Sequence, residues 1–211
     1  MLNATAAVLV GSRFTQSEIP DRYQQNCVYM PENGIDPARF SKIARHDGDG
    51  PMKACFIGRL VPYKGPDMLI AAAAPLLRDG RTTLDIIGDG PMMPELTALA
   101  QKEGVADAVR FHGWVAHEDV QTVLAEVNVL SFPSVREFGG GVVLEAMATG
   151  VAPVVVDYAG PGELVTDDIG RKTPIGSREE IIAGFRGLLT DLAHDPAAVA
   201  IRGQRRAQAP E

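Results

Sequence analysis

Short strand-like and helix-like segments alternate along most of this chain, and this alternation restricts the possible folds more than any other feature. The apolar strand-like runs are residues 54–58, 84–88, 109–113, 127–132 and 152–156. Because these runs lack the strict alternation of a strand with one solvated face, they favour a sheet covered by helices on both sides. The sequence therefore predicts an α/β fold with a doubly wound, parallel, Rossmann-like sheet.

The helical segments carry their own spacing and end signals. Apolar residues recur at the spacing of an amphipathic helix at residues 120–127 and again at 181–189. Ser177 and Glu180 form a capping box in front of the second helix, and Gly150 stands where a C-terminal cap is expected. Pro75 interrupts another helical pattern, so we expect it to kink or shorten that helix.

The chain divides into three parts by composition. Two short strand-like runs, at 8–10 and 27–30, precede a stretch rich in turn-forming residues, glycine and proline. We interpret this stretch as a linker between two domains. The predicted parts are therefore residues 1–30, which belong to a preceding domain, a linker over 31–52, and a main domain over 53–211.

Charge and composition exclude several classes of protein. Among 211 residues, Lys plus Arg is 20 and Asp plus Glu is 27, so the net charge is −7. This acidic balance argues against a nucleic acid as partner. No apolar run approaches the roughly 20 residues that cross a bilayer, and the start of the chain lacks the positive charge of a signal peptide. We read Cys27 and Cys55 as reduced core thiols and expect a cytoplasmic protein.

Familiar cofactor and metal motifs are incomplete. Residues 88–93 resemble a dinucleotide fingerprint, but Met93 stands in place of the third glycine, and residues 58–65 lack the order of a phosphate-binding P-loop. The Asp47–Asp49 pair reads as a solvated turn. The histidines have no metal-ligand spacing, so we expect neither a protein-bound metal nor a cofactor; they are His46, His112, His117 and His194.

Two cations stand where a strand passes into the next helix. Gly58 and Arg59 end a predicted strand, and Lys64 opens the helix that follows. Ligands of such sheets bind beyond the carboxyl ends of the strands, where Gly58 allows close approach of the backbone. Arg59 and Lys64 therefore favour an anionic ligand, with a surface salt bridge as the alternative interpretation.

A glycine-rich turn flanked by carboxylates is the strongest functional signal. Gly139, Gly140 and Gly141 lead into a helix whose first N–H groups are suited to an anion, and Val142 and Val143 continue that turn. The flanking carboxylates are Glu137, on the preceding loop, and Glu145, about one turn inside the helix. Because a carboxylate only accepts hydrogen bonds, each suits sugar hydroxyls. The alternative is a loop charge at 137 and a helix-terminus charge at 145.

These segments resemble the retaining GT-B glycosyltransferases of the glycosyl transferases group 1 family, which includes glycogen and sucrose-phosphate synthases. The similar segments, which span about residues 5–190, are 33–36, 58–65, 84–91, 111–115, 137–145 and 160–165. One departure is that Phe138 directly follows the first glutamate, where the family pattern has phenylalanine one position later.

The resemblance implies roles for these positions. Arg59 and Lys64 would bind the diphosphate of a nucleotide sugar, and Glu145 would hold its ribose. Glu137 would contact the donor sugar, and with Arg59 and Lys64 it would form the catalytic set. The backbone of residues 139–143 would face the sugar and phosphates, whereas the segment around Val115 would line the base pocket.

The resemblance also implies the biochemical setting. Residues 1–30 would be the last strand–helix unit of an N-terminal acceptor domain. The main domain would bind a UDP- or GDP-sugar without a metal, and the full enzyme would transfer a hexose to a glycan, lipid or small molecule in carbohydrate biosynthesis. We expect this chain alone to transfer no sugar. The alternatives are a non-catalytic nucleotide-sugar binding domain and a GT-B sugar-nucleotide epimerase.

Overall fold

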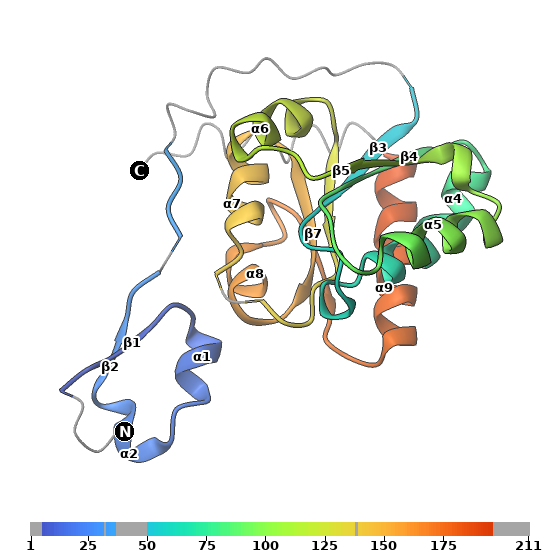
Figure 1. The fold of residues 1–211 in the computed structure, drawn as a ribbon. Coiled ribbons are helices and arrows are strands. Elements are labelled where there is room, and N and C mark those ends of the chain that lie inside the picture. The colour runs from blue at the N-terminus through green and yellow to red at the C-terminus, as the bar shows by residue number, and fades with distance from the viewer. Residues whose placement is uncertain (1–5, 32, 37–49, 138, 196–211) are drawn as a thin grey trace.

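Six parallel strands form the main sheet of the computed structural model, which describes residues 6–31, 33–36, 50–137 and 139–195 (Figure 1). The strands are β3 (Met52–Ile57), β4 (Thr82–Ile87), β5 (Val109–Gly113), β6 (Val129–Phe132), β7 (Ala152–Asp157) and β8 (Arg171–Pro174). Their order in the sheet is β5-β4-β3-β6-β7-β8. The chain therefore starts the sheet in the middle and reverses direction between β3 and β6, as in doubly wound folds.

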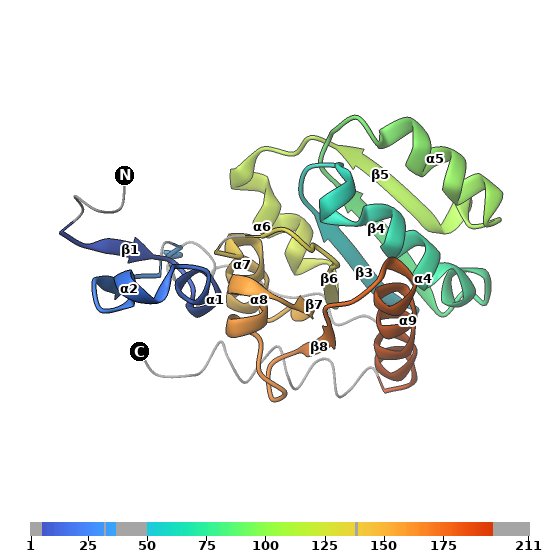
Figure 2. The same ribbon diagram turned by 90° about the horizontal axis from the view of Figure 1, so that it is seen from below.

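Helices cover both faces of this sheet, so the predicted α/β class is confirmed (Figure 2). On one side lie α4 (Pro66–Arg78), α5 (Met93–Lys102) and α9 (Arg178–His194), and on the other α6 (His117–Ala125), α7 (Gly141–Ala148) and α8 (Ala159–Leu164). Two 3-10 turns, η2 (Pro62–Lys64) and η3 (Ala106–Ala108), complete the connections. The strands are apolar on both faces because each face has its own helical cover, and Phe56 and Phe132 stack at 6.1 Å in the core between them.

Pro75 lies inside its helix and does not end it, while the kink expected as the alternative stays a prediction. Helix α4 runs three residues further, to Arg78. A proline lacks the N–H that would bond to the carbonyl four residues earlier, here that of Ala71. Arg186 of α9 supplies the missing donors, because its Nη2 lies 3.1 Å from the carbonyl oxygen of Ala71 and its Nε 3.4 Å from that of Ala72. The packing of two helices thus offsets a local helix breaker.

Helix α9 confirms its predicted start. Its N-cap Ser177 accepts a hydrogen bond from the backbone N–H of Glu180, and the Glu180 carboxylate accepts one from the Ser177 N–H at 2.8 Å. These bonds lower the pKa of the Glu180 carboxyl. The helix end at Gly150 is also as predicted, since this residue has φ +75° directly after the cap residue of α7.

Strand β8 was not predicted from the sequence. It contains Arg171, Lys172 and Pro174, and of its residues only Thr173 is buried. The strand forms one edge of the sheet, and edge strands carry charges and proline that discourage further pairing. Its pairing with β7 therefore depends on tertiary packing, and the pattern of apolar residues does not predict it.

A small second unit lies beside the main sheet. It consists of β1 (Val8–Val10), α1 (Arg13–Ser17), α2 (Asp21–Gln24) and β2 (Cys27–Tyr29), with β1 and β2 paired in parallel. The Glu163 carboxylate accepts the N–H groups of Arg13 and Phe14 at 2.9 and 2.8 Å, which joins α1 to α8. Strand β3 begins at Met52, the last residue of the predicted linker, while the domain division itself stays a prediction.

The two cysteines differ. Cys55 is fully buried in β3, and burial, together with the negative charge of Asp85, raises the pKa of its thiol. Cys27 is only partly buried, so its expected place in the core is wrong; β2 belongs to the small two-stranded sheet and not to the six-stranded one. Neither forms a disulfide in the described structure. None of the described helices is long and apolar enough to cross a membrane.

Candidate functional site

The site lies where the strand order reverses. Strands β3 and β6 are neighbours, but the helices that follow them, α4 and α7, cover opposite faces of the sheet. The loops at the carboxyl ends of these two strands therefore part in opposite directions, which opens the position where ligands of doubly wound sheets bind. The first loop carries Arg59 and Lys64, and the second carries Glu137 and the glycine turn.

Backbone contacts hold these two loops in register. The N–H of Val135 donates to the carbonyl oxygen of Tyr63 at 2.9 Å. Gly65 has φ +70°, and a Cβ at this position would lie 2.8 Å from the backbone oxygen of Pro133. Only glycine therefore allows this close approach. The loop after β3 is consequently fixed against the loop after β6.

This arrangement joins Lys64 to Glu137. Their side chains form an ion pair, although 73 residues separate them in sequence. They are 17% and 16% exposed, so solvent screens their charges less than it would at the surface. The ammonium group also lies 5.2 Å from the ring centroid of Phe132. The ammonium group of Lys64 thus contacts the Glu137 carboxylate and is available to an anionic ligand.

A cavity of about 570 Å³ opens at this ion pair. Phe14 and Thr15 of α1 line one side, and the rest of the wall comes from the loops of the main domain, namely Tyr63, Lys64, Arg136, Glu137 and Tyr158. The rings of Phe14 and Tyr158 lie 4.6 Å apart across the two units. Arg59 is exposed and does not line this cavity, so the structure does not bring the two predicted cations to one wall.

The glycine turn begins α7. Gly140 is the N-cap with φ +68°, and Gly141 is the first helical residue. The first-turn N–H groups of Gly141 and Val142 have no partner within an α-helix, whereas the N–H of Val143 donates to the Gly140 carbonyl at 2.9 Å. Val143 is also fully buried, so its side chain serves the core. Phe138 lies outside the described residues.

Asn33 packs against this turn. A Cβ at Gly139 would lie 1.9 Å from Nδ2 of Asn33, and a Cβ at Gly141 would lie 3.7 Å from both Cγ and Oδ1 of the same side chain. In the sequence, Asn33 belongs to segment 33–36, one of the segments that resemble the family, and no binding role was predicted for it. Asn33 belongs to the predicted linker, so the beginning of that linker lies against the start of α7.

Glu145 has a different environment from Glu137. Its Oε1 lies 2.6 Å from Nε2 of His117, the first residue of α6, and its side chain is 14% exposed. Val115 is partly buried against the core, while the neighbouring Trp114 is 76% exposed. The structure therefore contains two separate pairs. Glu145 contacts His117, and Glu137 contacts Lys64.

The glycines at the end of β4 have a packing role. A Cβ at Gly88 would lie 1.9 Å from the Gly58 carbonyl oxygen, and one at Gly90 would lie 2.4 Å from that of Leu60. The backbone bonds agree, since the Leu60 N–H donates to the Asp89 carbonyl at 2.9 Å. The segment that resembles a dinucleotide fingerprint is thus a support for the loop that carries Arg59.

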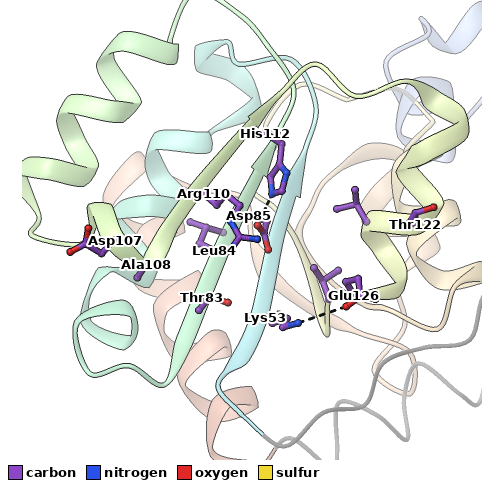
Figure 3. A pocket seen from close by; sticks show the side chains of 12 residues that line it. Lys53, Thr83, Leu84, Asp85, Asp107, Ala108, Arg110, His112, Thr122 and Glu126 are labelled. Carbon is purple, nitrogen blue, oxygen red and sulfur yellow. Dashed lines mark hydrogen bonds and ion pairs between the residues drawn. The ribbon is translucent and has the colours of Figure 1, made fainter.

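A second cavity, of about 410 Å³, opens on the face of the sheet rather than at the carboxyl ends of its strands (Figure 3). Two pairs lie in its wall: His112 Nε2 lies 2.6 Å from Asp85 Oδ1, and Lys53 Nζ lies 3.9 Å from Glu126 Oε2. It contains none of the residues predicted to bind a ligand. We therefore place the functional site at the ion pair of Lys64 and Glu137.

The described residues contain no candidate metal centre. No three His, Cys, Asp or Glu side chains in that part of the chain are arranged to hold a metal ion. The Asp47–Asp49 pair and His46 lie outside it. The sequence analysis did not assign a role to His117, and spacing offers no signal for it, because its partner lies 28 residues away on another helix.

Comparison with known proteins agrees with this geometry. The model of the family described as Glycosyl transferases group 1 matches residues 39–204. A glycogen synthase of Mycobacterium tuberculosis is 36% identical over 178 residues, covering 84% of this chain and 41% of the relative. A D-inositol 3-phosphate glycosyltransferase of Salinispora tropica is 31% identical over 92% of this chain and 42% of its own length. The chain thus spans about two fifths of the length of these curated relatives.

Solved structures share the fold. Anabaena Alr3699/HepE in complex with UDP and glucose superposes with a TM-score of 0.79 at 19% identity, over 96% of this chain and 57% of that one. The C-terminal domain of LpcC, a glycosyl transferase group 1 family protein from Francisella tularensis, superposes with a TM-score of 0.68 at 22% identity, over 82% and 95%.

Proposed function

This chain belongs to the glycosyl transferases group 1 family, and we propose that it is the part of a retaining glycosyltransferase that binds the nucleoside-diphosphate sugar. The observation that carries this proposal is the Lys64–Glu137 pair at the reversal point of the sheet, next to the glycine turn of α7. The pair supplies a cation and an acceptor of sugar hydroxyl groups within one cavity. In the whole protein, the transferred hexose would pass to an acceptor held by a preceding domain.

The chemistry of such a transfer suits these groups. Cleaving the bond between the sugar and the diphosphate leaves negative charge on the diphosphate. Lys64 and the first-turn N–H groups of α7 would stabilise that charge as preorganised donors. Arg59, which does not line the cavity, would have to reach the diphosphate from outside it. Glu137 would bind hydroxyl groups of the sugar and hold its reacting carbon in position. Glu145 would accept hydrogen bonds from the ribose diol.

The ion pair gives Lys64 two competing partners. In the structure, its ammonium group donates to the carboxylate of Glu137. An arriving diphosphate offers it a second anion, and a sugar hydroxyl offers Glu137 a new donor in return. We expect the nucleotide sugar to replace the contact between Lys64 and Glu137 with its own contacts to each side chain. Neither buried charge is then left without a partner.

A thermal-shift panel tests the proposal. The panel contains UDP-, GDP- and ADP-sugars, and each is compared with its free nucleoside. At least one nucleotide sugar should raise the melting temperature of this chain, because a ligand that binds only the folded state stabilises it. Lys64→Ala should remove the shift. Lys53→Ala is the matched control, since Lys53 pairs with Glu126 at the other cavity and should leave the shift intact. The absence of any shift with all three sugars in the unaltered chain would contradict the proposal.

Binding is expected to need no added metal. The positive charge that meets the diphosphate would come from Lys64 and the start of α7, and no cluster of metal-ligating side chains occurs among the described residues. A calorimetric titration with UDP or GDP in the presence of EDTA should give the same affinity as one without it. Loss of binding in EDTA that magnesium restores would refute this prediction.

A further inference from the structure

The carboxylate of Glu145 is held by a side chain that solvent reaches. His117 Nε2 lies 2.6 Å from Glu145 Oε1, and the imidazole is 67% exposed while the carboxylate is 14% exposed. The contact joins the first residue of α6 to the middle of α7, two helices that pack against each other. Any ligand that uses Glu145 must therefore share it with His117.

We propose that His117 is a positioning residue for nucleotide binding. Uncharged and with its proton on Nε2, it orients the Glu145 carboxylate toward the ribose diol; as an imidazolium, it competes with the ribose for that carboxylate. This inference rests on the proposed role of Glu145 in holding the ribose, and it adds that proton uptake by one exposed histidine weakens the donor site.

The hydrogen-bonding capacity of the two groups gives the physical reason. A carboxylate has about four lone-pair positions and accepts hydrogen bonds only. One bond from a neutral Nε2–H fixes the Glu145 side chain and leaves Oε2 and part of Oε1 for two ribose hydroxyls. A charged donor forms a shorter and stronger bond and draws the carboxylate charge to itself. Neutral hydroxyl groups then bind the same carboxylate less well.

Charged groups on α6 and α7 act on His117. On its own helix, Glu118 and Asp119 follow in the first turn and favour the imidazolium, whereas the positive end of the α6 dipole disfavours it. On α7, Glu145 is the only titratable side chain. Imidazole side chains in general change charge between about pH 5 and pH 8, which sets the two pH values to be compared.

The test measures the affinity for UDP-glucose or GDP-glucose, whichever the thermal-shift panel shows to bind, by calorimetry at about pH 5.5 and about pH 8. A sugar-linked diphosphate is the right probe, because the terminal phosphate of a free nucleotide titrates near pH 6 and would mask the effect. His117→Gln keeps an uncharged donor, and His117→Ala removes it. The matched control is His112→Gln, because His112 makes an equally short contact to Asp85 at the other cavity.

The unaltered chain and His112→Gln should bind about tenfold more tightly at the higher pH. His117→Gln should bind tightly at both values, and His117→Ala should bind about three- to tenfold more weakly than the unaltered chain at the higher pH, with no pH dependence. Equal affinity of the unaltered chain at both pH values, or a pH dependence that survives in His117→Gln, would overturn the inference. Failure of both nucleotide sugars to bind at either pH would instead contradict the proposed function.

Discussion

Gly88→Ala should destabilise the main domain by about 4 kcal/mol or more, a large part of the stability of a typical domain. Gly88 has φ +130°, and a Cβ there would lie 1.9 Å from the Gly58 carbonyl oxygen, an atom of the backbone that cannot turn aside. Accommodating the methyl group would separate the end of β4 from the end of β3, and with it the loop that carries Arg59. Chemical denaturation followed by circular dichroism measures the loss.

Gly80→Ala is the matched control for this prediction. Gly80 also has a positive φ, +65°, but a Cβ there would meet no atom within 4 Å. Its alanine variant therefore reports the backbone strain alone, which we expect to cost about 1 kcal/mol. Should Gly88→Ala cost no more than Gly80→Ala, the close approach of the two loops would not be an obligatory feature of the fold.

Glu145→Ala and Glu137→Ala are expected to fail in different ways. Free UDP or GDP contains the ribose, so Glu145→Ala should weaken its binding about ten- to a hundredfold, the effect of losing a charged hydrogen-bond partner. Glu137 is expected to touch only the transferred sugar, so Glu137→Ala should bind the free nucleotide at least as well as the unaltered chain. In the intact enzyme, Glu137→Ala should abolish most of the transferase activity.

The ion pair with Lys64 gives the reason why Glu137→Ala should not weaken nucleotide binding. Removing Glu137 releases Lys64 from its present partner and leaves the ammonium group available to the diphosphate. Lys64→Ala should weaken nucleotide binding, and Glu137→Ala added to it should restore part of the loss, because the Glu137 carboxylate, having lost the ammonium group of Lys64, repels the diphosphate. Calorimetric titration of the two single variants and the double variant gives this coupling. Equal weakening by Glu137→Ala and Glu145→Ala would show that the two carboxylates are wrongly assigned.

The fold class was readable from the sequence because it depends on local patterning. Apolar runs such as 54–58 and 152–156 are buried on both faces wherever they lie in a doubly wound sheet, so their composition alone identifies them. The capping box of Ser177 and Glu180 is equally local, since its two partners lie within one helical turn. The order of motifs along the chain placed the candidate residues at the carboxyl edge of that sheet.

The pairing of the site residues was decided only by the tertiary structure. Lys64 meets Glu137 and His117 meets Glu145 because strand order brings distant loops and helices together, and neither sequence spacing nor residue type records that order. The same reason applies to Pro75, whose missing hydrogen bond is replaced by Arg186 from a helix more than a hundred residues later. Local sequence thus determined the elements of the sheet other than β8, and which side chains follow its strands. Long-range packing decided which charges share a site, because a charge is paired by distance in space and not by distance along the chain.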